Sequence, residues 1–438
     1  MMDVIVSKYG GSSITCTNDF ERIKKITSDD SKRKVIVVSA PGRRSKDDIK
    51  VTDMLIELAK TKDQSLVNKI IGRYKEIMPD KSLDDISKLL NERIERELDE
   101  DEYLASLKAF GEEACARLLA QYLDAEYIDP IELFLVSDEF DNAKIQPVSE
   151  SMIATRMANI SWTCVVPGFY GYTKDGLIAT FGRNASDVTG AYIAASIDAA
   201  MYEVFTDTDG VLAASPAIVD NPHKVPELTF REMRDLAYSG FTIMHPEAME
   251  PVARKGVSIH IRNTFSYPND GTYILQDRIS DTDKPIVGVA YQDGFCSFNI
   301  ERFGLNEEVG IVRRILQVFE DDKISVEFIP SAIDDVSIVL KESQLKRDSV
   351  GKIERKIRMI TGYDANIEFQ ERLGSLVVAG KGLKGYRGIS AEIQLTLANA
   401  GVNIKFITQG SQERCIVYGI DSSDGTKAVK AVYEKYLR

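Results

Sequence analysis

Short apolar runs alternate with longer amphipathic stretches over roughly the first 280 residues of the chain. Five of these runs are rich in β-branched residues and end in Gly, Pro, Asn or Asp, which predicts buried strands: VIVSKYGG, KVIVVSAPG, TCVVPGFYG, MYEVFTD and VSIHIRN. Between Lys62 and Gln121 the pattern is mostly helical. Strands that alternate with helices predict an α/β fold with a mostly parallel central sheet sandwiched by helices. Ligands of such sheets bind beyond the carboxyl ends of the strands, so the loops there are the first candidates for chemistry.

The last third of the chain contains an internal repeat. GIVRRIL at Gly310 and ISVEFI at Ile324 correspond to GISAEIQ at Gly388 and VNIKFI at Val402, an ungapped offset of 388 − 310 = 78 residues. At the same offset SIVL aligns with CIVY, and SFNI aligns with SLVV. Each copy predicts the order strand, helix, strand, strand, helix, which is a small ferredoxin-like α+β module.

The two copies differ in the strand that closes the sheet. NIEFQ at 366–370 would close the first copy, whereas the second copy ends at Arg438 without such a strand. IVGVAYQ at 286–292 precedes the first copy, and we infer that it supplies the missing strand, so that the two modules are intertwined. The alternative is that 286–292 forms an edge of the N-terminal sheet. The predicted domains are residues 1–283 and 284–438, with modules at about 294–371 and at about 372–438 plus strand 286–292.

Composition narrows the class of protein. With 438 residues, 44% of them apolar and 28% charged, the chain is expected to form two or three globular domains. A net charge of −13 disfavours nucleic acid and anionic membrane surfaces as partners. There is no apolar run of membrane-spanning length and no cationic leader, which predicts a cytoplasmic protein. The five cysteines and three histidines are too scattered to predict a disulfide, a metal site or a triad.

The strongest local signal is VSKYGGSSI at 6–14, where a strand leads into a Gly-Gly-Ser-Ser turn. Gly10 and Gly11 permit close backbone approach, so that their N–H groups and that of Ser12 can face phosphate oxygens. The Lys8 ammonium can neutralise charge on a transferred group. This combination suits a phosphoryl donor; the alternative is a turn that only joins a strand to a helix.

This segment resembles the signature of the aspartokinases, which have the amino acid kinase fold. Further similar segments follow in order along the chain: VVSAPG, VTDMLIEL, FGEEACARLL, VVPGFYG, TFGRNASDVTGA, FTDTDGVL and MHPEAMEPV. The C-terminal repeat is similar to the paired ACT domains with which this family senses its end products. The resemblance implies transfer of phosphate from ATP to the side-chain carboxylate of L-aspartate, the first step towards lysine, threonine and methionine. It implies Mg²⁺ carried by the nucleotide, without a dedicated protein cage.

The resemblance also assigns roles to single residues. Lys8 and Asp187 would form the catalytic pair, Arg183 would hold the α-carboxylate of aspartate, and Glu112 would receive its ammonium group. The remaining matches are Ser39, Thr52, Phe169 and Ser186 for the substrate, and Lys8, Gly10, Gly11, Ser12, Thr206 and Asp207 for the nucleotide. The alternatives from the residues alone are a solvated Arg183, carboxylates that only stabilise helix starts, and ordinary caps, turns and core positions.

Three positions depart from the family pattern. The Tyr, Arg and Lys that the family usually carries near the nucleotide fall here on Leu212, Ala217 and Thr242. Other cations, such as Arg231, Lys224 or Lys255, would have to replace the lost charge, or the nucleotide affinity would differ from the family norm.

A candidate effector site lies in the first repeat. The sequence predicts a helix that opens at Val309 and Gly310, whose free N–H groups could bind the carboxylate of a small amino acid. Glu327 on the next strand could receive the ammonium, and by resemblance these residues and Val326 form the effector pocket, with lysine as the expected ligand. The alternative is a glycine that only starts a helix. ACT sheets pair edge to edge, which implies a homodimer or a dimer of dimers.

Two rival functions remain open. The chain could be an amino acid sensor that keeps a catalytically weak kinase body, as the three departures suggest. It could also be a kinase of the same fold for another acceptor, such as glutamate or a carbamate.

Overall fold

The computed structural model describes residues 2–182, 185–238, 244, 246–279, 284–346 and 348–438, and it divides into two compact units. The first unit comprises Met1–Val211, Pro226–Phe230 and Thr242–Arg278, and the second comprises Leu212–Val225, Arg231–Phe241 and Ile279–Arg438. The second unit thus includes two segments that precede the predicted boundary near residue 283. The boundary itself stays a prediction.

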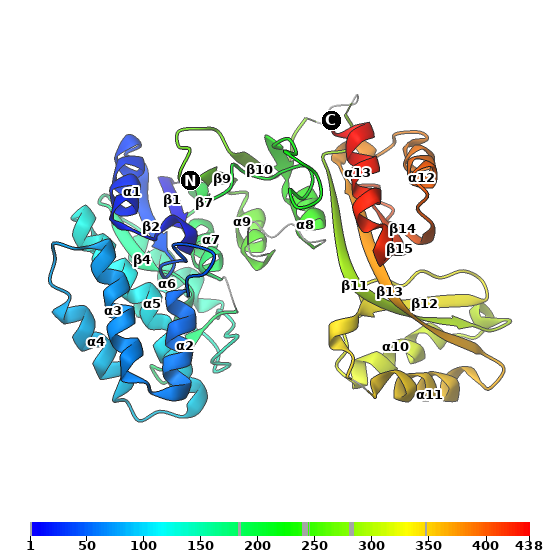
Figure 1. The fold of residues 1–438 in the computed structure, drawn as a ribbon, viewed down its shortest axis with the longest axis horizontal. Helices are drawn as coiled ribbons and strands as arrows, with labels where there is room; N and C mark the ends of the chain where they lie inside the picture. The colour runs from blue at the N-terminus through cyan, green and yellow to red at the C-terminus, as the bar shows by residue number, and fades with distance from the viewer. Residues whose placement is uncertain (1, 183–184, 239–243, 245, 280–283, 347) are drawn as a thin grey trace. The chain divides into compact units, whose positions relative to one another are not determined.

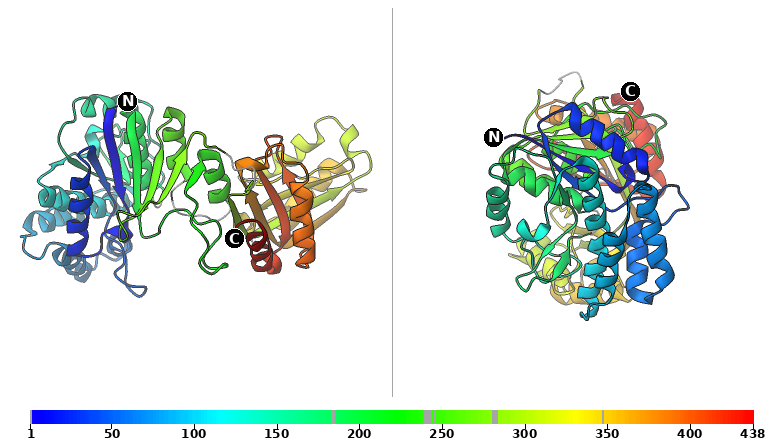
Figure 2. Two further views of the ribbon diagram at one scale, coloured as in Figure 1. Left: turned by 90° about the horizontal axis from the view of Figure 1, so that it is seen from above. Right: turned by 90° about the vertical axis from the view of Figure 1, so that its left-hand side faces the viewer.

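An eight-stranded sheet forms the centre of the first unit, in the order β3-β4-β2-β1-β7-β9-β10-β8 (Figures 1 and 2). The strands are β1 (Met2–Tyr9), β2 (Arg33–Val38), β3 (Glu126–Tyr127), β4 (Cys164–Pro167), β7 (Ala199–Thr206), β8 (Glu227–Thr229), β9 (Ile259–Asn263) and β10 (Thr272–Leu275). Neighbouring strands are parallel except β9 and β10. Each of the five predicted runs forms one of these strands, which confirms the mostly parallel sheet. A separate hairpin pairs β5 (Tyr170–Tyr172) with β6 (Ile178–Thr180).

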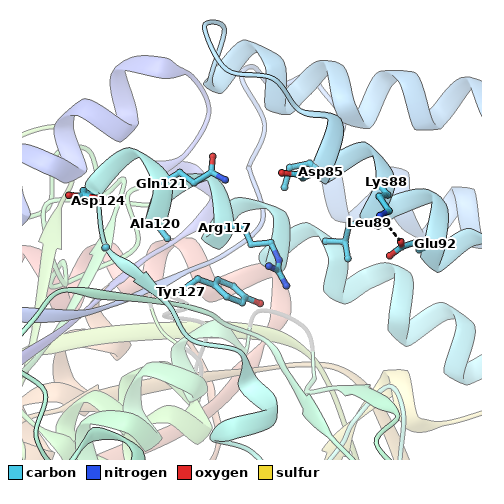
Figure 3. Close-up of a pocket in the computed structure, with 11 residues that line it drawn as sticks. Asp85, Lys88, Leu89, Glu92, Arg117, Ala120, Gln121, Asp124 and Tyr127 are labelled. Carbon is cyan, nitrogen blue, oxygen red and sulfur yellow. Dashed lines mark ion pairs between the residues drawn. The ribbon is translucent and has the colours of Figure 1, made fainter.

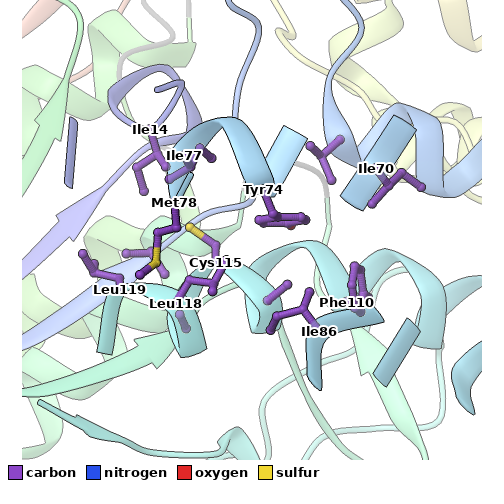
Figure 4. Close-up of a cluster of buried hydrophobic side chains, with 14 of the residues drawn as sticks. Ile14, Ile70, Tyr74, Ile77, Met78, Ile86, Phe110, Cys115, Leu118 and Leu119 are labelled. Atoms are coloured by element: carbon purple, nitrogen blue, oxygen red, sulfur yellow. The ribbon is translucent and has the colours of Figure 1, made fainter. Parts of the chain in front are cut away.

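The helices cover both faces of this sheet. They are α1 (Thr17–Asp29), α2 (Val51–Thr61), α3 (Gln64–Ile77), α4 (Asp84–Ile94), α5 (Glu100–Leu123), α6 (Val148–Met157), α7 (Ser186–Ser196) and α9 (Met249–Lys255). Helices α1 to α5 share one hydrophobic core with strand residues such as Tyr9, Ile36 and Val38, and Figure 4 shows part of this core around Tyr74 and Phe110. Successive strand residues point to opposite faces, so Val35 and Val37 face the side where α7 packs on β1, β2 and β7. No helix in the described part of the chain is both long and apolar enough to cross a membrane.

The second unit is built on an antiparallel five-stranded sheet in the order β12-β11-β13-β15-β14. Its strands are β11 (Gly288–Glu301), β12 (Asp335–Lys341), β13 (Asn366–Ala379), β14 (Ile404–Gln409) and β15 (Cys415–Asp421), and its helices are α8 (Phe230–Tyr238), α10 (Ile311–Asp321), α11 (Ser349–Thr361), α12 (Ile389–Asn399) and α13 (Gly425–Tyr436). The two long strands β11 and β13 run side by side, with α10 and α11 along one half and α12 and α13 along the other (Figure 1).

The predicted exchange of a strand between the two modules is present in this sheet. Residues Gly288–Gln292 of β11 pair with Ser375–Ala379 of β13, which in turn pair with β15 of the second module. Residues 288–292 therefore lie in the C-terminal sheet and not at an edge of the first one. Two pairs of strands that were predicted separately are continuous in the structure. Residues 288–292 of the first run and SFNI lie in the single strand β11, and NIEFQ and SLVV lie in the single strand β13.

The repeat holds for the helices and fails for one strand. Helices α10 and α12 begin at Ile311 and Ile389, so the offset of 389 − 311 = 78 residues is kept. VNIKFI forms much of β14, but the corresponding ISVEFI is not a regular strand and makes only an isolated bridge between Phe328 and Val339. Pro330 follows directly after this segment; it has no N–H to donate to a ladder and restricts the residue before it.

Candidate active site

A cavity of about 560 Å³ lies beyond the carboxyl ends of the central strands of the first unit. Tyr9, Val38 and Phe205, near the ends of β1, β2 and β7, stand side by side in register, so the loops that leave these strands meet at one edge of the sheet. All the described residues that were predicted for the substrate and nucleotide sites line the cavity: Lys8, Gly10, Gly11, Ser12, Ser39, Thr52, Glu112, Phe169, Ser186, Asp187, Thr206 and Asp207. Arg183 lies outside the described residues, and its predicted role stays a prediction.

A buried ion pair forms the centre of the cavity. Lys8 is the next-to-last residue of β1 and Asp187 is the second residue of α7, and their charged atoms are 2.5 Å apart. Both side chains are almost fully buried. Strand β7 holds the start of α7 in place, because the Tyr202 hydroxyl donates to the backbone oxygen of Asp187 at 2.9 Å. Gly190 is required there, since a Cβ at this position would lie 2.6 Å from the Tyr202 hydroxyl.

The glycine turn after β1 packs directly against the loop after β2. The Gly42 N–H donates to the oxygen of Gly11 at 2.9 Å, and a Cβ on Gly42 would lie 2.4 Å from that oxygen. A Cβ on Gly11 would in turn lie 2.8 Å from the oxygen of Ala40. Ser12 lines the cavity, whereas the Ser13 hydroxyl is fully buried and hydrogen bonds to Thr264 at 2.6 Å. Only one of the two serine hydroxyls in the motif therefore faces the cavity.

Glu112 presents a buried carboxylate to the cavity from the middle of α5. Its Oε2 is buried and has no hydrogen-bond partner among the described residues. Burial raises the pKa of Glu112 to about 8, and the backbone N–H of Ala40 and the ammonium groups of Lys108 and Lys8 limit the rise. A buried acceptor without a donor is costly in an isolated protein, and an amino group of a ligand would supply both the donor and the opposite charge.

Phe169 and Ser186 line the wall next to α7. Phe169 has a positive φ of 80°, and its backbone is held by an N–H bond to Thr189 Oγ1 at 3.0 Å and by the Phe181 N–H, which donates to its oxygen at 2.8 Å. A Cβ on Gly168 would lie 2.7 Å from the Cβ of Ser186, so this strand end and the helix start are in direct contact. Ser39 and Thr52 come from the end of β2 and the start of α2.

Thr206 and Asp207 line the cavity where the chain leaves β7. The Thr206 hydroxyl donates to Asp207 Oδ1 at 3.1 Å, and both residues are partly or fully exposed. They are the predicted nucleotide turn, and they lie on the same cavity wall as the glycine turn, because the Gly10 N–H donates to Phe205 O at 3.2 Å. Phosphate groups bound by the glycine turn would therefore lie close to this strand end.

The family departures fall elsewhere. Leu212 and Ala217 belong to the second unit, where Leu212 forms a bridge with Lys224, and Thr242 lies outside the described residues. Of the three cations considered as replacements, Lys224 and Arg231 belong to the second unit, and Lys255 of the first unit does not line the cavity. Among the described residues, the lining cations besides Lys8 are Arg43, Lys50 and Lys108, which no sequence motif indicated. Lys108 could have been found from its spacing of four residues before Glu112 on a helix.

A second cavity of about 570 Å³ lies between α4 and α5 (Figure 3). Lys88 and Glu92 on α4 form an exposed ion pair at 3.8 Å, and the Arg117 guanidinium lies 4.3 Å from the centre of the Tyr127 ring. It contains none of the predicted site residues. The described part of the chain contains no group of three or more His, Cys, Asp or Glu side chains that could hold a metal ion.

The predicted effector residues lie around the start of α10 in the second unit. Gly310 is the residue before the helix, with φ of 77° and open space where a Cβ would stand, and Val309 is almost fully exposed. Val326 packs on the same core as the α10 residues Ile311 and Ile315. The Glu327 N–H donates to Val339 O at 2.8 Å, and its buried Oε2 has no hydrogen-bond partner among the described residues.

Comparisons with known proteins agree with this architecture. The model of the amino acid kinase family matches residues 3–263, and an ACT domain model matches residues 376–436. Aspartokinase 3 of Bacillus subtilis (strain 168) is 35% identical, over 99% of this chain and 98% of its own length. The crystal structure of aspartate kinase from Clostridium acetobutylicum has a TM-score of 0.89 at 34% identity, and the match covers 99% of this chain and all of that one. Aspartokinase III of E. coli in complex with aspartate and ADP shares the fold, with a TM-score of 0.79 at 19% identity over 98% and 99% of the two chains.

Proposed function

Because the chain belongs to the aspartokinases, with an amino acid kinase domain followed by an ACT region, we propose that it phosphorylates the side-chain carboxylate of L-aspartate with ATP, giving 4-phospho-L-aspartate and ADP. The observation that carries the proposal is the 560 Å³ cavity, which combines the glycine turn, the Lys8–Asp187 pair and the carboxylate of Glu112.

The reaction needs little acid–base chemistry. A carboxylate oxygen of aspartate forms a bond to the γ-phosphorus of ATP, the bond from that phosphorus to the β,γ-bridging oxygen breaks, and ADP leaves with the electron pair. The nucleophile is already ionised, so no proton has to be removed. Catalysis then depends on holding two anions in line and on stabilising the charge of the transferring group.

The residues of the cavity fit these two tasks. Lys8, held by Asp187, would place a cation beside the transferring phosphoryl group, and the backbone N–H groups after Gly10 would hold the phosphate oxygens. Glu112 would accept the ammonium group of aspartate, and Arg183 would hold its α-carboxylate. Mg²⁺ usually keeps several waters and binds phosphates with one or two carboxylates, so we expect it to arrive with ATP and to neutralise phosphate charge.

For the ACT region we propose a feedback role, with lysine as the inhibiting amino acid. Gly310 at the start of α10 leaves N–H groups for a carboxylate, and the buried Glu327 oxygen without a partner suits an ammonium group. Inhibition requires that lysine bind a less active conformation more tightly, typically by about 1 to 3 kcal/mol. We also propose a homodimer or a dimer of dimers through edge strands of the ACT sheet, which light scattering on the purified protein tests.

A coupled assay of ADP formation tests the function. ADP should appear only with MgATP and L-aspartate together, and lysine should lower the rate where threonine and methionine do not. ADP formation that is independent of aspartate would contradict the proposal, and inhibition by none of the three would contradict the feedback role.

One observation favours a second candidate, an amino acid sensor without kinase activity. Leu212 and Ala217 replace a Tyr and an Arg that the family usually carries near the nucleotide, and the second replacement removes a positive charge that would face ATP. Lysine binding without measurable ATP binding would select this candidate over the enzyme.

A further inference from the structure

A buried lysine that the proposed transfer does not use lines the same cavity. Lys108 is on α5, four residues before Glu112, so the two side chains lie on one face of the helix. Its side chain is 6% exposed, and its ammonium lies 5.3 Å from the centre of the Phe169 ring. A lysine in the interior is expensive unless its charge has a function or a good partner.

The contacts of Lys108 within the described residues do not explain this burial. Its Nζ donates to Thr180 Oγ1 at 3.1 Å and forms an ion pair with Asp141. The Asp141 side chain is 77% exposed, so water screens its attraction for the ammonium. An ammonium has three N–H donors and these contacts use two, which leaves one donor for a ligand in the cavity.

The charges of the cavity point to the same ligand group. Among the described residues that line the cavity, four charged ones are buried: Lys8, Lys108, Glu112 and Asp187. Lys8 and Asp187 neutralise each other at 2.5 Å, which leaves Lys108 as a cation and Glu112 as an acid whose ionised form is negative, on adjacent turns of one helix. An α-amino acid carries the complementary pair, a carboxylate and an ammonium group.

We propose that Lys108 is a substrate-binding residue whose ammonium donates an N–H to a carboxylate oxygen of the acceptor amino acid, while Glu112 accepts from the acceptor's ammonium group. The inference rests on the proposed function and deepens it. Lys108 and Glu112 would thus bind the two oppositely charged groups that every α-amino acid carries.

A purely structural role makes a different prediction. The alternative is that Lys108 only connects the loop of Asp141 to α5 through the ion pair. Removal of Lys108 and removal of Asp141 should then lower the thermal stability by similar amounts and leave aspartate binding unchanged. Asp141→Asn is therefore the matched control, because it removes the exposed partner and leaves the cavity lining intact.

The test is calorimetric binding of L-aspartate to the full-length protein, together with steady-state KM values for aspartate and ATP, in wild type, Lys108→Met, Lys108→Arg and Asp141→Asn. Met keeps the length of the side chain without its charge. We expect Lys108→Met to raise the Kd and KM for aspartate by about 10- to 100-fold, as for other hydrogen bonds to charged groups. Lys108→Arg should recover part of the loss, and Asp141→Asn should stay within twofold of wild type. The KM for ATP should change by less than twofold in all three.

The pH dependence of aspartate binding gives a second readout. The groups that face Glu112 are Lys108 and Cys115 on α5, Lys8 on β1, Tyr74 on α3 and the backbone N–H of Ala40. Burial raises the pKa of the Cys115 thiol and of the Tyr74 hydroxyl, so both stay neutral in the assay. Loss of the Lys108 charge should move the half-point of aspartate binding to higher pH, because the Lys108 ammonium lowers the pKa of Glu112, whereas Asp141→Asn should leave the half-point unchanged.

Two results would overturn the inference. A folded Lys108→Met protein that binds aspartate within twofold of wild type would overturn the inference alone. Failure of the wild type to bind aspartate would overturn it together with the proposed function. Competition by asparagine shows which carboxylate Lys108 binds. If Lys108 binds the side-chain carboxylate, Lys108→Met should weaken the binding of aspartate and leave the binding of asparagine unchanged. If it binds the α-carboxylate, the binding of both should weaken.

Discussion

The first unit contains two cavities of almost equal volume, about 560 and about 570 Å³, with very different chemistry. The cavity at the strand ends contains four buried charged side chains and a turn of closely packed glycines. The cavity between α4 and α5 is lined mostly by residues of these two helices, among them the exposed ion pair of Lys88 and Glu92 (Figure 3).

Volume therefore does not identify the site. Exposed ion pairs on a helix are weak and well solvated, so the Lys88–Glu92 pair does not mark the cavity between α4 and α5 as a binding site. At the strand ends, an unpartnered carboxylate oxygen on Glu112 and a third N–H on Lys108 stay available because burial hides them from water. The predictions below test residues of the cavity at the strand ends, and three of them include a matched position elsewhere.

The largest effect is expected at Lys8. Lys8→Ala should lower kcat by about two to four orders of magnitude, because it removes the cation beside the transferring phosphoryl group. Lys88→Ala removes an exposed lysine from the other cavity and should leave kcat unchanged. Steady-state ADP formation measures both. A wild-type rate in Lys8→Ala would rule out the proposed role of the ion pair.

Glu112 and Glu92 form the second comparison. Glu112→Gln should raise the KM for aspartate by about 10- to 100-fold, since a neutral amide cannot balance the ammonium of the substrate. Glu92→Gln in the other cavity should have no effect. Initial rates at varied aspartate and fixed MgATP distinguish them, and equal KM values in the two variants would contradict the placement of the acceptor.

Activity should also depend on pH through Glu112. Burial raises the pKa of this carboxyl to about 8, and only its ionised form accepts the substrate ammonium. Protonation therefore dominates below that pH, and kcat/KM for aspartate should fall by up to about tenfold per pH unit as the pH drops below 8. This fall in kcat/KM at low pH should be absent in Glu112→Gln. A kcat/KM that stays flat between pH 6 and 8 in wild type would show that Glu112 is not the group that binds the ammonium.

The smallest effect concerns the backbone of the glycine turn. Gly42→Ala should lower the free energy of unfolding by about 1 to 3 kcal/mol, because the new Cβ would lie 2.4 Å from Gly11 O. Gly72→Ala on α3 has open space and should stabilise the protein by roughly 0.5 to 1 kcal/mol. Urea titration gives both values; a neutral Gly42→Ala would show that the two loops are not in contact.

The sequence was sufficient to predict five of the eight strands of the first sheet, including those whose following loops carry the site. β-branched runs closed by turn residues predicted β1, β2, β4, β7 and β9, and a spacing of 78 residues predicted the α10 and α12 pair. Local pattern could not show that β11 and β13 run unbroken through both modules, because the pairing partners of a strand lie far away in sequence. It also gave no sign that ISVEFI would lose its regular pairing beside Pro330.

The same limit applies inside the site. Lys8, Glu112 and Asp187 were selected because they lie in recognisable motifs, and the structure brings them into one cavity. Lys108 was missed because a lysine on a helix is normally solvated, and only the packing of α5 against β6 buries it. Ser13 follows Ser12 in the same motif, but its hydroxyl turns inward to Thr264, which the motif did not indicate.

A structure of the full chain bound to L-aspartate and MgADP is the most direct test of the claim that the cavity at the strand ends is the active site. We predict the nucleotide phosphates against Gly10–Ser12 beside Lys8, and the aspartate ammonium within hydrogen-bond distance of Glu112. Ligands bound between α4 and α5, or aspartate bound away from Glu112, would contradict the claim.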